Sequence, residues 1–468
     1  RRSRECQHRA GCTDAKESPC PGDASGSVAA SFVVGDRMQP VAPAASLLRP
    51  SACPGLWRVV PARDGGICRV KLPGGLLTSA QARAVAEAAR LCGSGVLELT
   101  NRSNLQLRGV RDENHEPLVP RLLAAGLGPR NPAADDVRNL LLSPAAGRDR
   151  SAHLDTRPLA GRLLALLENT PEFHALSAKF ALQLDGGEAL AMLDHPHDLW
   201  LSALPGGTHL AFGLAGCPRD PALGVIPLAQ AERLVEAVLR LFLQMAGAHT
   251  RMRQLLAELP VEQFLARLPL SVQQPWATPR RPRYDSPPLG AHLQAQSGWV
   301  MLLAGVPLGR LHADQLSVLA ELADSEGCGE LRLTPWQGVL LPDIPGSRRA
   351  FVGQALHDLG LLLETRTPLA RLLACSGLPG CARAQADTKA DARKLAERLP
   401  AQIAQVHLSG CPRSCAAAHI APYTLLAQPG GRYDLYRREQ GLAGFGRLLA
   451  QSLDIDQAGE RLAAGSPE

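Results

Sequence analysis

The segment LPGGLLTSAQARAVAEAARLCGSGVLELTNRSNLQL, which begins at Leu72, has a second copy further along the chain. The copy, VPLGRLHADQLSVLAELADSEGCGELRLTPWQGVLL, begins at Val306. Identical residues coincide at a single offset of 234 positions, without a gap. The matches include Pro73/Pro307, Gln81/Gln315, Gly95/Gly329, Leu97/Leu331 and Thr100/Thr334. Agreement of this density indicates that the chain consists of two related halves.

Each copy has the pattern of a strand, a helix and a second strand. Apolar residues recur with helical spacing in the middle of each copy, and they alternate with polar residues after the glycine that both copies share, Gly95 and Gly329. We therefore expect strands at residues 67–72, 299–303, 95–100 and 329–334, and helices at residues 79–90 and 313–323. Helical segments follow at 159–167 and 384–398, strands at 180–184 and 406–408, and two amphipathic helices at 228–246 and 251–268. The Pro- and Arg-rich residues 274–290 are expected to be a linker.

The bulk composition is that of a globular protein with several domains. The chain has 468 residues, of which 45% are hydrophobic and 20% are charged, and its net charge is +6. It has no basic tract with interleaved aromatics and no apolar run of the roughly 20 residues that span a bilayer, so we expect neither a nucleic-acid partner nor a membrane partner. Twelve cysteines without a secretory signal predict a reducing, cytoplasmic location. We expect residues 1–45 to be a disordered leader or to lie outside the natural reading frame.

Four cysteines near the C-terminus carry most of the chemical information. They read C-x5-C at Cys375 and Cys381 and C-x3-C at Cys411 and Cys415, with Gly, Pro and Ser around each pair. Such residues build loops that can turn four sulfurs towards one centre, and four thiolates are the usual ligands of a [4Fe–4S] cluster. Structural zinc, two disulfides and four unrelated core cysteines remain as alternatives, although zinc usually has closer pairs.

The motifs LTNRSNLQLRG, DDVRNLLLSP, SAKFALQL and CSGLPGC…SGCPRSC together resemble the sulfite and nitrite reductase family over about residues 50–435. The resemblance implies an α+β fold of two pseudo-symmetric halves, each with a ferredoxin-like half-domain and an α/β domain. It implies half-domains at residues 46–115 and 291–362, a first α/β domain at 116–273, the linker at 274–290, and the [4Fe–4S] domain at 363–468.

The same resemblance implies the site residues. The four cysteines would bind a [4Fe–4S] cluster, and in the reductases the last of them, here Cys415, also bridges to the iron of a sirohaem. Arg102, Arg138 and Lys179 match active-site cations of the family. Ala181 stands where the reductases have the second lysine of a K-x-K pair. Because a crowded set of cations is what binds a small anion and delivers protons to it, this loss disfavours sulfite or nitrite reduction.

A branch of the family, precorrin-3B synthase, resembles the chain in length and in the spacing of its motifs. This resemblance implies an oxidoreductase, a monooxygenase that hydroxylates precorrin-3A at C20 with O2 and forms a γ-lactone in cobalamin biosynthesis. The carboxylates of the tetrapyrrole substrate would bind to Arg102, Arg108 and Arg138. A second centre would be either a mononuclear non-haem iron or a sirohaem. Because the chain lacks a dinucleotide-binding GxGxxG after a strand, a separate NAD(P)H-linked donor protein is expected to supply electrons.

Several alternatives remain open from the sequence. His195 and His197, with Asp194 and Asp198, are weak candidates for ligands of a non-haem iron, and His209 and His419 are comparable. The main alternative function is an assimilatory sirohaem-dependent sulfite or nitrite reductase. A cluster or tetrapyrrole carrier without catalytic activity and a structural protein stabilised by zinc are the two others.

Overall fold

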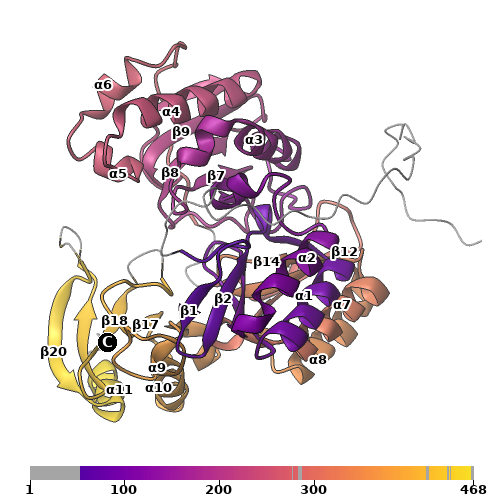
Figure 1. The fold of residues 1–468 in the computed structure, drawn as a ribbon, viewed down its shortest axis with the longest axis vertical. Helices are drawn as coiled ribbons and strands as arrows, with labels where there is room; N and C mark the ends of the chain where they lie inside the picture. The colour runs from indigo at the N-terminus through magenta and orange to yellow at the C-terminus, as the bar shows by residue number, and fades with distance from the viewer. Residues whose placement is uncertain are drawn as a thin grey trace, which may run out of the picture. The chain divides into compact units, whose positions relative to one another are not determined.

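The structure is a computed structural model, and it describes residues 53–276, 278–282, 287–417, 421–439, 442 and 444–464. The expected leader and His419 lie outside the described residues. The described residues form four five-stranded sheets with helices packed against them (Figure 1). This arrangement confirms the predicted α+β fold class.

The two halves exchange short strands. One sheet has the order β1 (Val60–Ala62), β2 (Gly65–Val70), β5 (Leu105–Val110), β4 (Val96–Leu99) and β13 (Arg310–His312). Its counterpart has the order β11 (Gly290–Leu293), β12 (Trp299–Gly305), β15 (Gly338–Pro345), β14 (Glu330–Leu333) and β3 (Leu76–Thr78). Strand β13 of the second half thus pairs with β4 of the first, and β3 of the first half pairs with β14 of the second. Leu311 lies opposite Leu97, and Leu331 lies opposite Leu77, which are equivalent pairs at the 234-residue offset.

The helices of the repeat follow the same offset. Helices α1 (Ser79–Cys92) and α2 (His115–Ala124) correspond residue for residue to α7 (Ala313–Glu326) and α8 (Arg349–Asp358). Both α1 and α7 begin with a capping box, formed by Thr78 with Gln81 and by His312 with Gln315. These four helices form one group beside the two sheets (Figure 1).

One hydrophobic core joins the two halves of the repeat. It contains fully buried residues of both copies, among them Leu77, Leu97, Leu311, Leu319 and Leu331. Since each half contributes a strand to the sheet of the other and side chains to the same core, neither ferredoxin-like half has a complete core of its own.

The third sheet belongs to the first half. Its order is β10 (Gly224–Pro227), β9 (His209–Gly216), β8 (His197–Ala203), β7 (Leu182–Asp185) and β6 (Leu140–Leu141). Helices α3 (Arg157–Asn169) and α4 (Ala231–Met245) pack on it through a second core. The expected helix at residues 251–268 is wrong: two short helices, α5 (Met252–Leu255) and α6 (Val261–Leu265), lie there instead. Pro260 separates them, because proline lacks an N–H and disfavours helical backbone at the residue before it.

The fourth sheet positions the cysteines. Its order is β16 (Leu372–Ala374), β17 (Val406–Ser409), β18 (Tyr423–Gln428), β19 (Arg432–Arg437) and β20 (Arg447–Leu453), with helices α9 (Gly377–Gly380), α10 (Thr388–Ala396) and α11 (Ile455–Ala464). Strands β16, β17 and β18 run parallel to one another. The loops that follow β16 and β17 therefore emerge side by side at the same edge of the sheet.

Short 3-10 helices connect many of these elements. They are η2 (Pro73–Gly75), η3 (Asp112–Asn114), η4 (Pro132–Val137), η5 (Pro171–Ala175), η6 (Leu228–Gln230), η7 (Pro307–Gly309), η8 (Gly346–Arg348) and η9 (Pro368–Arg371). Helices η2 and η7 are equivalent at the 234-residue offset.

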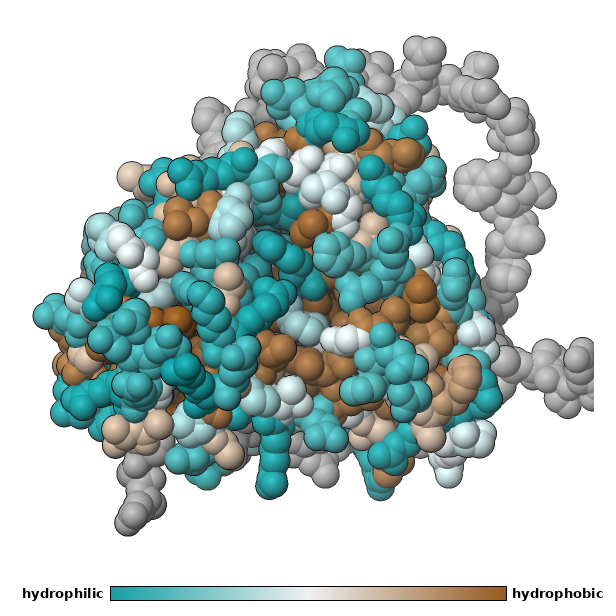
Figure 2. All heavy atoms as spheres, turned by 90° about the horizontal axis from the view of Figure 1, so that it is seen from below, coloured by the Kyte–Doolittle hydropathy of each residue, from teal (hydrophilic) through white to brown (hydrophobic). Residues whose placement is uncertain are grey.

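None of the helices in the described ranges is long and apolar enough to cross a membrane. The face seen from below is mainly hydrophilic, with apolar side chains grouped in patches between the polar ones (Figure 2).

Candidate functional site

The two cysteine pairs lie on the adjacent loops after β16 and β17. Cys375 directly follows β16, and Cys381 ends the short helix α9. Cys411 comes two residues after β17, and Cys415 follows Ser414, whose backbone has a positive φ of 53°. Because Ala374 of β16 pairs with Leu408 of β17, the register of the sheet brings the two loops together.

The four thiols lie within electrostatic reach of one another. Although Cys415 is exposed on one side, the protein around it raises the pKa of its thiol, and the charges of Cys411, Cys375 and Cys381 raise it further. In the described ranges, no three or more His, Cys, Asp or Glu side chains lie close enough together to bind a single metal ion. A four-iron cluster takes one thiolate per iron, so its ligands stand wider apart than those of a single ion.

The loop backbone also suits a cluster. The backbone N–H of Gly410 donates a hydrogen bond to Sγ of Cys375, with N and Sγ 3.2 Å apart. A Cβ at Gly410 would lie only 2.8 Å from the Cβ of Ala384 and 3.2 Å from the same Sγ. The glycine therefore lets the backbone come close to the sulfur, and N–H donors to cluster sulfurs are among the features that tune such centres. The donor set and its surroundings fit a [4Fe–4S] cluster.

Arg102 lies in the hairpin loop between β4 and β5. Its guanidinium is half-buried, and its Nη1 donates to the backbone oxygen of Lys179 at 3.1 Å. Burial lowers the pKa of Arg102 to about 10, and the charge of Arg251 lowers it further, whereas Asp198 opposes this. The structure thus brings Arg102 beside the segment that contains Lys179.

Lys179 and Ala181 differ sharply in their surroundings. The Lys179 side chain is exposed. Ala181 is only 2% exposed, and together with Arg102 and His197 it lines a small cavity. Its N–H donates to Asp198 at 2.9 Å, so the backbone here is fixed. The side chain of Ala181 therefore lines a confined space beside the half-buried cation Arg102.

Arg138 follows η4 and is 8% exposed. Its Nε lies 2.7 Å from Oε1 of Glu168, which forms an ion pair. Its Nη1 is buried and has no hydrogen-bond partner among the described residues. A buried donor without a partner is energetically unfavourable, and an anionic ligand would satisfy it.

Two further cations were missed in the sequence. Burial lowers the pKa of Arg69 of β2, and the thiolates of Cys53 and Cys415 oppose this effect. Arg69 is therefore close enough to Cys415 to interact with it electrostatically. Lys71 is buried, its Nζ donates to the backbone oxygen of Asp135 at 2.7 Å, and burial lowers its pKa to about 8. The available signal was alternation along the strand, since Cys68 and Val70 face the core while Arg69 faces away from it.

Arg108 of β5 is bound by protein groups. Its side chain is 2% exposed, and its Nε and Nη2 donate to the two carboxylate oxygens of Asp64 at 3.0 and 2.8 Å. The same Nη2 donates to the backbone oxygen of Gly380, which precedes Cys381, at 2.8 Å. These contacts place Arg108 against the first cysteine loop, and its role as a ligand of tetrapyrrole carboxylates stays a proposal.

The histidines and aspartates at 194–198 have partners of other kinds. Asp198 binds Arg251 through both oxygens, at 3.0 and 2.9 Å, and Asp194 pairs with Arg219. Burial and the charge of Arg102 lower the pKa of His197 to about 3, so the ring is neutral. These residues do not surround a common metal position.

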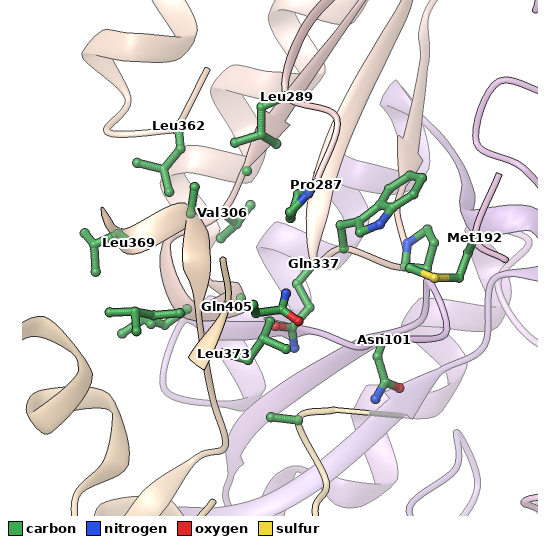
Figure 3. A pocket seen from close by; sticks show the side chains of 18 of the residues that line it. Asn101, Met192, Pro287, Leu289, Val306, Gln337, Leu362, Leu369, Leu373 and Gln405 are labelled. Atoms are coloured by element: carbon green, nitrogen blue, oxygen red, sulfur yellow. The ribbon is translucent and has the colours of Figure 1, made fainter. Parts of the chain in front are cut away.

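An apolar pocket borders the loop that contains Arg102, through Asn101. Asn101 and Met192 lie on one side of it and Leu289, Leu362 and Leu369 on the other (Figure 3). Its wall also includes Trp336, the residue equivalent to Arg102, and Ala416, the neighbour of Cys415. The pocket therefore adjoins both the cysteine loop and the loop that contains Arg102.

The comparisons with known proteins identify the modules. A family model described as "Nitrite/Sulfite reductase ferredoxin-like half domain" matches residues 60–125 and 292–359. A second, "Nitrite and sulphite reductase 4Fe-4S domain", matches residues 133–275. The second match falls on the α/β domain of the first half, in which Cys217 is the single cysteine.

Curated relatives include two kinds of protein. A ferredoxin–nitrite reductase of Synechococcus elongatus is 30% identical over 406 residues, which cover 79% of this chain and 77% of the relative. The chloroplastic ferredoxin–nitrite reductase of Betula pendula is 32% identical over 387 residues, but the chain spans only 66% of its length. A precorrin-3B synthase of Sinorhizobium sp is 28% identical over 433 residues, which cover 88% of this chain and 92% of the relative.

A solved structure supports the same fold. The Mycobacterium tuberculosis NirA protein superposes with a TM-score of 0.70 and 22% identity, over 84% of this chain and 79% of that protein.

Proposed function

Because the chain belongs to the nitrite and sulfite reductase family of iron–sulfur oxidoreductases, we propose that it is a precorrin-3B synthase-like monooxygenase. It would hydroxylate precorrin-3A at C20 with O2 and form the γ-lactone from a ring acetate. One oxygen atom would enter the substrate and the other would leave as water, with two electrons from a separate donor protein.

The observation that carries the proposal is the closed environment of Ala181. Sulfite and nitrite are small anions, and their reduction needs several cations and proton donors converging on one atom. At Ala181 a methyl group replaces the second lysine of the family, and the cavity around it is bounded by Arg102 and His197. Ala181 therefore removes one cation of the reductase pattern from this part of the site. The neighbouring His197 is neutral and does not replace it.

The cations that remain suit a larger ligand with several carboxylates. Burial is the main cause of the lowered pKa of Lys71, and the charges of Arg69 and Arg138 add to it. Burial likewise lowers the pKa of Arg102, and the charge of Arg69 adds to it. Arginine binds carboxylates in a planar, two-pronged geometry, and a tetrapyrrole has many carboxylates. These four cations would orient the macrocycle by binding its carboxylate side chains. Among them, Arg138 offers a buried Nη1 that has no hydrogen-bond partner in the described residues.

The cysteine loops would hold the redox centre. Cys375, Cys381, Cys411 and Cys415 would bind a [4Fe–4S] cluster, which supplies electrons one at a time when it is bound. The match to the 4Fe-4S domain of the reductases supports the presence of a cluster, although the matched residues 133–275 do not include these four cysteines. The second centre is proposed to be a mononuclear non-haem iron, or otherwise a sirohaem with Cys415 as its axial ligand.

The overall length of the chain also supports this branch. The alignment with the Sinorhizobium precorrin-3B synthase covers nearly all of both chains, whereas the chain covers about two thirds of the chloroplastic nitrite reductases. The alternative is an assimilatory sirohaem-dependent sulfite or nitrite reductase. It is favoured by the 30–32% identity to ferredoxin–nitrite reductases and by the presence of Arg102, Arg138 and Lys179.

One experiment separates the two functions. Protein purified without air would be incubated with precorrin-3A, a reducing system and 18O2, and the product would be analysed by mass spectrometry. The same preparation would be assayed for sulfite and nitrite reduction with a reduced dye. Incorporation of one 18O atom into the tetrapyrrole supports the monooxygenase. Reduction of either anion without tetrapyrrole turnover would establish the reductase instead.

A further inference from the structure

A buried carboxylate joins the two halves of the repeat to the first cysteine loop. Glu98 of β4 is 7% exposed and faces three cations. Its Oε1 accepts from Nη2 of Arg310 at 2.7 Å and lies 3.8 Å from Nζ of Lys389, and its Oε2 lies 3.9 Å from Nη1 of Arg108. Lys389, Arg108 and Arg310 together lower the pKa of Glu98 to about 2 against the opposing effect of burial. The four side chains come from β4, β5, β13 and α10.

The partners of Glu98 hold the Cys375–Cys381 loop at three points. The hydroxyl of Ser376, next to Cys375, donates to Oε2 of Glu98 at 2.7 Å. Lys389 donates to the backbone oxygen of Ala374 at 3.2 Å, on the other side of Cys375. Arg108 donates to the backbone oxygen of Gly380, next to Cys381. Each contact lies one residue from a cysteine of the first pair.

The loop packs closely against this network. Asp64 fixes the guanidinium of Arg108 from the other side through two hydrogen bonds. A Cβ at Gly380 would come within 2.5 Å of Nη2 of Arg108 and 3.2 Å of the Cβ of Ser376. The close approach of the loop to the cations therefore depends on a glycine at this position.

The equivalent position in the other half has the opposite charge. At the 234-residue offset Glu98 corresponds to Arg332, which is also buried. Arg332 pairs with Glu330, and Arg148 pairs with Glu330 and Asp343 at 3.0 and 2.7 Å. Two cations there face two carboxylates. Around Glu98, by contrast, one carboxylate faces Arg108, Arg310 and Lys389, and Asp64 binds Arg108 from the other side, while burial lowers the pKa of Lys389.

We propose that Glu98 is a positioning residue that fixes the first cysteine loop in the conformation that binds the cluster. It acts through Ser376, Arg108 and Lys389 and does not touch the cluster itself. The inference rests on the proposed [4Fe–4S] cluster.

Two substitutions test it in the full-length protein purified without air. Glu98→Gln keeps the shape of the side chain but removes its charge, and Ser376→Ala removes only the hydroxyl link to the loop. Glu330→Gln is the matched control, because it changes a half-buried carboxylate of the equivalent network, which contacts none of the four proposed cluster cysteines; the cysteine beside it, Cys328, lies outside the proposed site. Iron and acid-labile sulfide content, the midpoint potential of the cluster and the rate of cluster loss to a chelator would be measured for each protein.

We expect Ser376→Ala to lose the cluster to the chelator about tenfold faster than the unmodified protein, the effect of one lost hydrogen bond to a charged group. Glu98→Gln should lose iron and sulfide to a larger extent, and any cluster that it retains should have a more positive potential, because a nearby negative charge is gone. Glu330→Gln should match the unmodified protein in all three measurements.

The outcomes distinguish this inference from the proposed function. If the unmodified protein contains no iron and sulfide, the cluster assignment itself fails. If the unmodified protein contains the cluster, but Glu98→Gln and Ser376→Ala retain it with unchanged potential and unchanged rate of loss, the positioning role of Glu98 is wrong. Should Glu98→Gln not fold, Ser376→Ala alone decides, since its substitution leaves the buried charges intact.

Discussion

Arg102 and Trp336 occupy the same position in two hairpin loops of the same conformation. In the first loop the N–H of Thr100 donates to the oxygen of Asn104 at 2.9 Å, and in the second the N–H of Thr334 donates to the oxygen of Gly338 at 2.9 Å. The fourth residue of each loop has a positive φ, 58° at Ser103 and 57° at Gln337. One backbone thus presents a cation in one half and an indole in the other, so the two equivalent regions differ by side-chain chemistry and not by fold.

We predict that Arg102→Ala weakens substrate binding and leaves the cluster intact. Loss of one charged hydrogen-bonded contact should reduce the binding free energy by about 1–3 kcal/mol. Binding of the tetrapyrrole would be measured by titration without O2. Arg121→Ala, at an exposed position on α2, is the control. Equal affinity in the two variants would show that Arg102 is not a ligand-binding residue.

A lysine at position 181 should destabilise the protein. The side chain would enter a small cavity beside Arg102 and the neutral His197, where the neighbouring carboxylate, Asp198, is already bound by Arg251. Ala181→Lys should therefore lose about 3–5 kcal/mol more stability than Ala181→Met, which adds a comparable volume without charge. Thermal unfolding of both variants would be compared. Equal stability would indicate a hydrated cavity able to accept the second lysine of the reductase pattern.

The buried His197 should make the protein less stable in acid. Its pKa is about 3 in the folded state against an ordinary value of 6.5. Burial is the main cause, and the positive charges of Arg102 and Arg251 also disfavour protonation. The hydrogen bond to the backbone oxygen of His195 raises the pKa and offsets part of this lowering. The unfolded chain binds the proton more readily, so this contribution is complete above pH 6.5 and is lost as pH falls towards 3. Its slope is at most about 1.4 kcal/mol per pH unit.

Urea denaturation between pH 4 and 7 would measure this effect. His197→Asn should lose less stability than the unmodified protein over that range, whereas His357→Asn, at an exposed position, should behave as the unmodified protein does. Parallel pH profiles for all three proteins would mean that His197 binds a proton as readily in the folded state as in the unfolded chain, and would contradict the lowered pKa.

The exchanged strands should make the two halves of the repeat unfold together. Leu311 of β13 is fully buried against Leu97 of the other half. Leu311→Ala should destabilise the protein by about 2–5 kcal/mol, while Leu91→Ala, at an exposed position on α1, should change stability by less than about 0.5 kcal/mol. Circular dichroism and cluster absorbance should report one common transition. Two separate transitions in the repeat would contradict the shared core.

The sequence predicted the local elements of the repeat well because their signals are local. The bounds expected for the helices at 79–90 and 313–323 fall within α1 and α7, and the strands at 95–100 and 329–334 contain β4 and β14. The exchange of β3 and β13 between the halves was not predicted, because alternation along a strand shows which face is buried but not which strand lies beside it. The break at Pro260 was available in the sequence and was overlooked.

The site could be predicted only in part from the sequence, because a local pattern does not show which distant residues lie beside it. The cysteine pairs and Arg102 lie in recognisable motifs, and the structure brings each pair to the same edge of one sheet. The contacts of Arg108 with Asp64 and Gly380 join residues that are 44 and 272 positions apart. The convergence of Arg310 and Lys389 on Glu98 likewise depends on the packing of both halves. Such partners follow from the tertiary fold and have no local pattern that predicts them.

The most direct test of the central claim is chemical analysis of the protein purified without air, alongside its Cys411→Ala variant. The account predicts iron and acid-labile sulfide in equal amounts, about four of each per chain beyond any iron of a second centre, with the electron paramagnetic resonance of a reduced [4Fe–4S] cluster. It predicts the loss of that signal and of the sulfide in Cys411→Ala. One zinc ion per chain without sulfide, or an unchanged cluster in the variant, would contradict it.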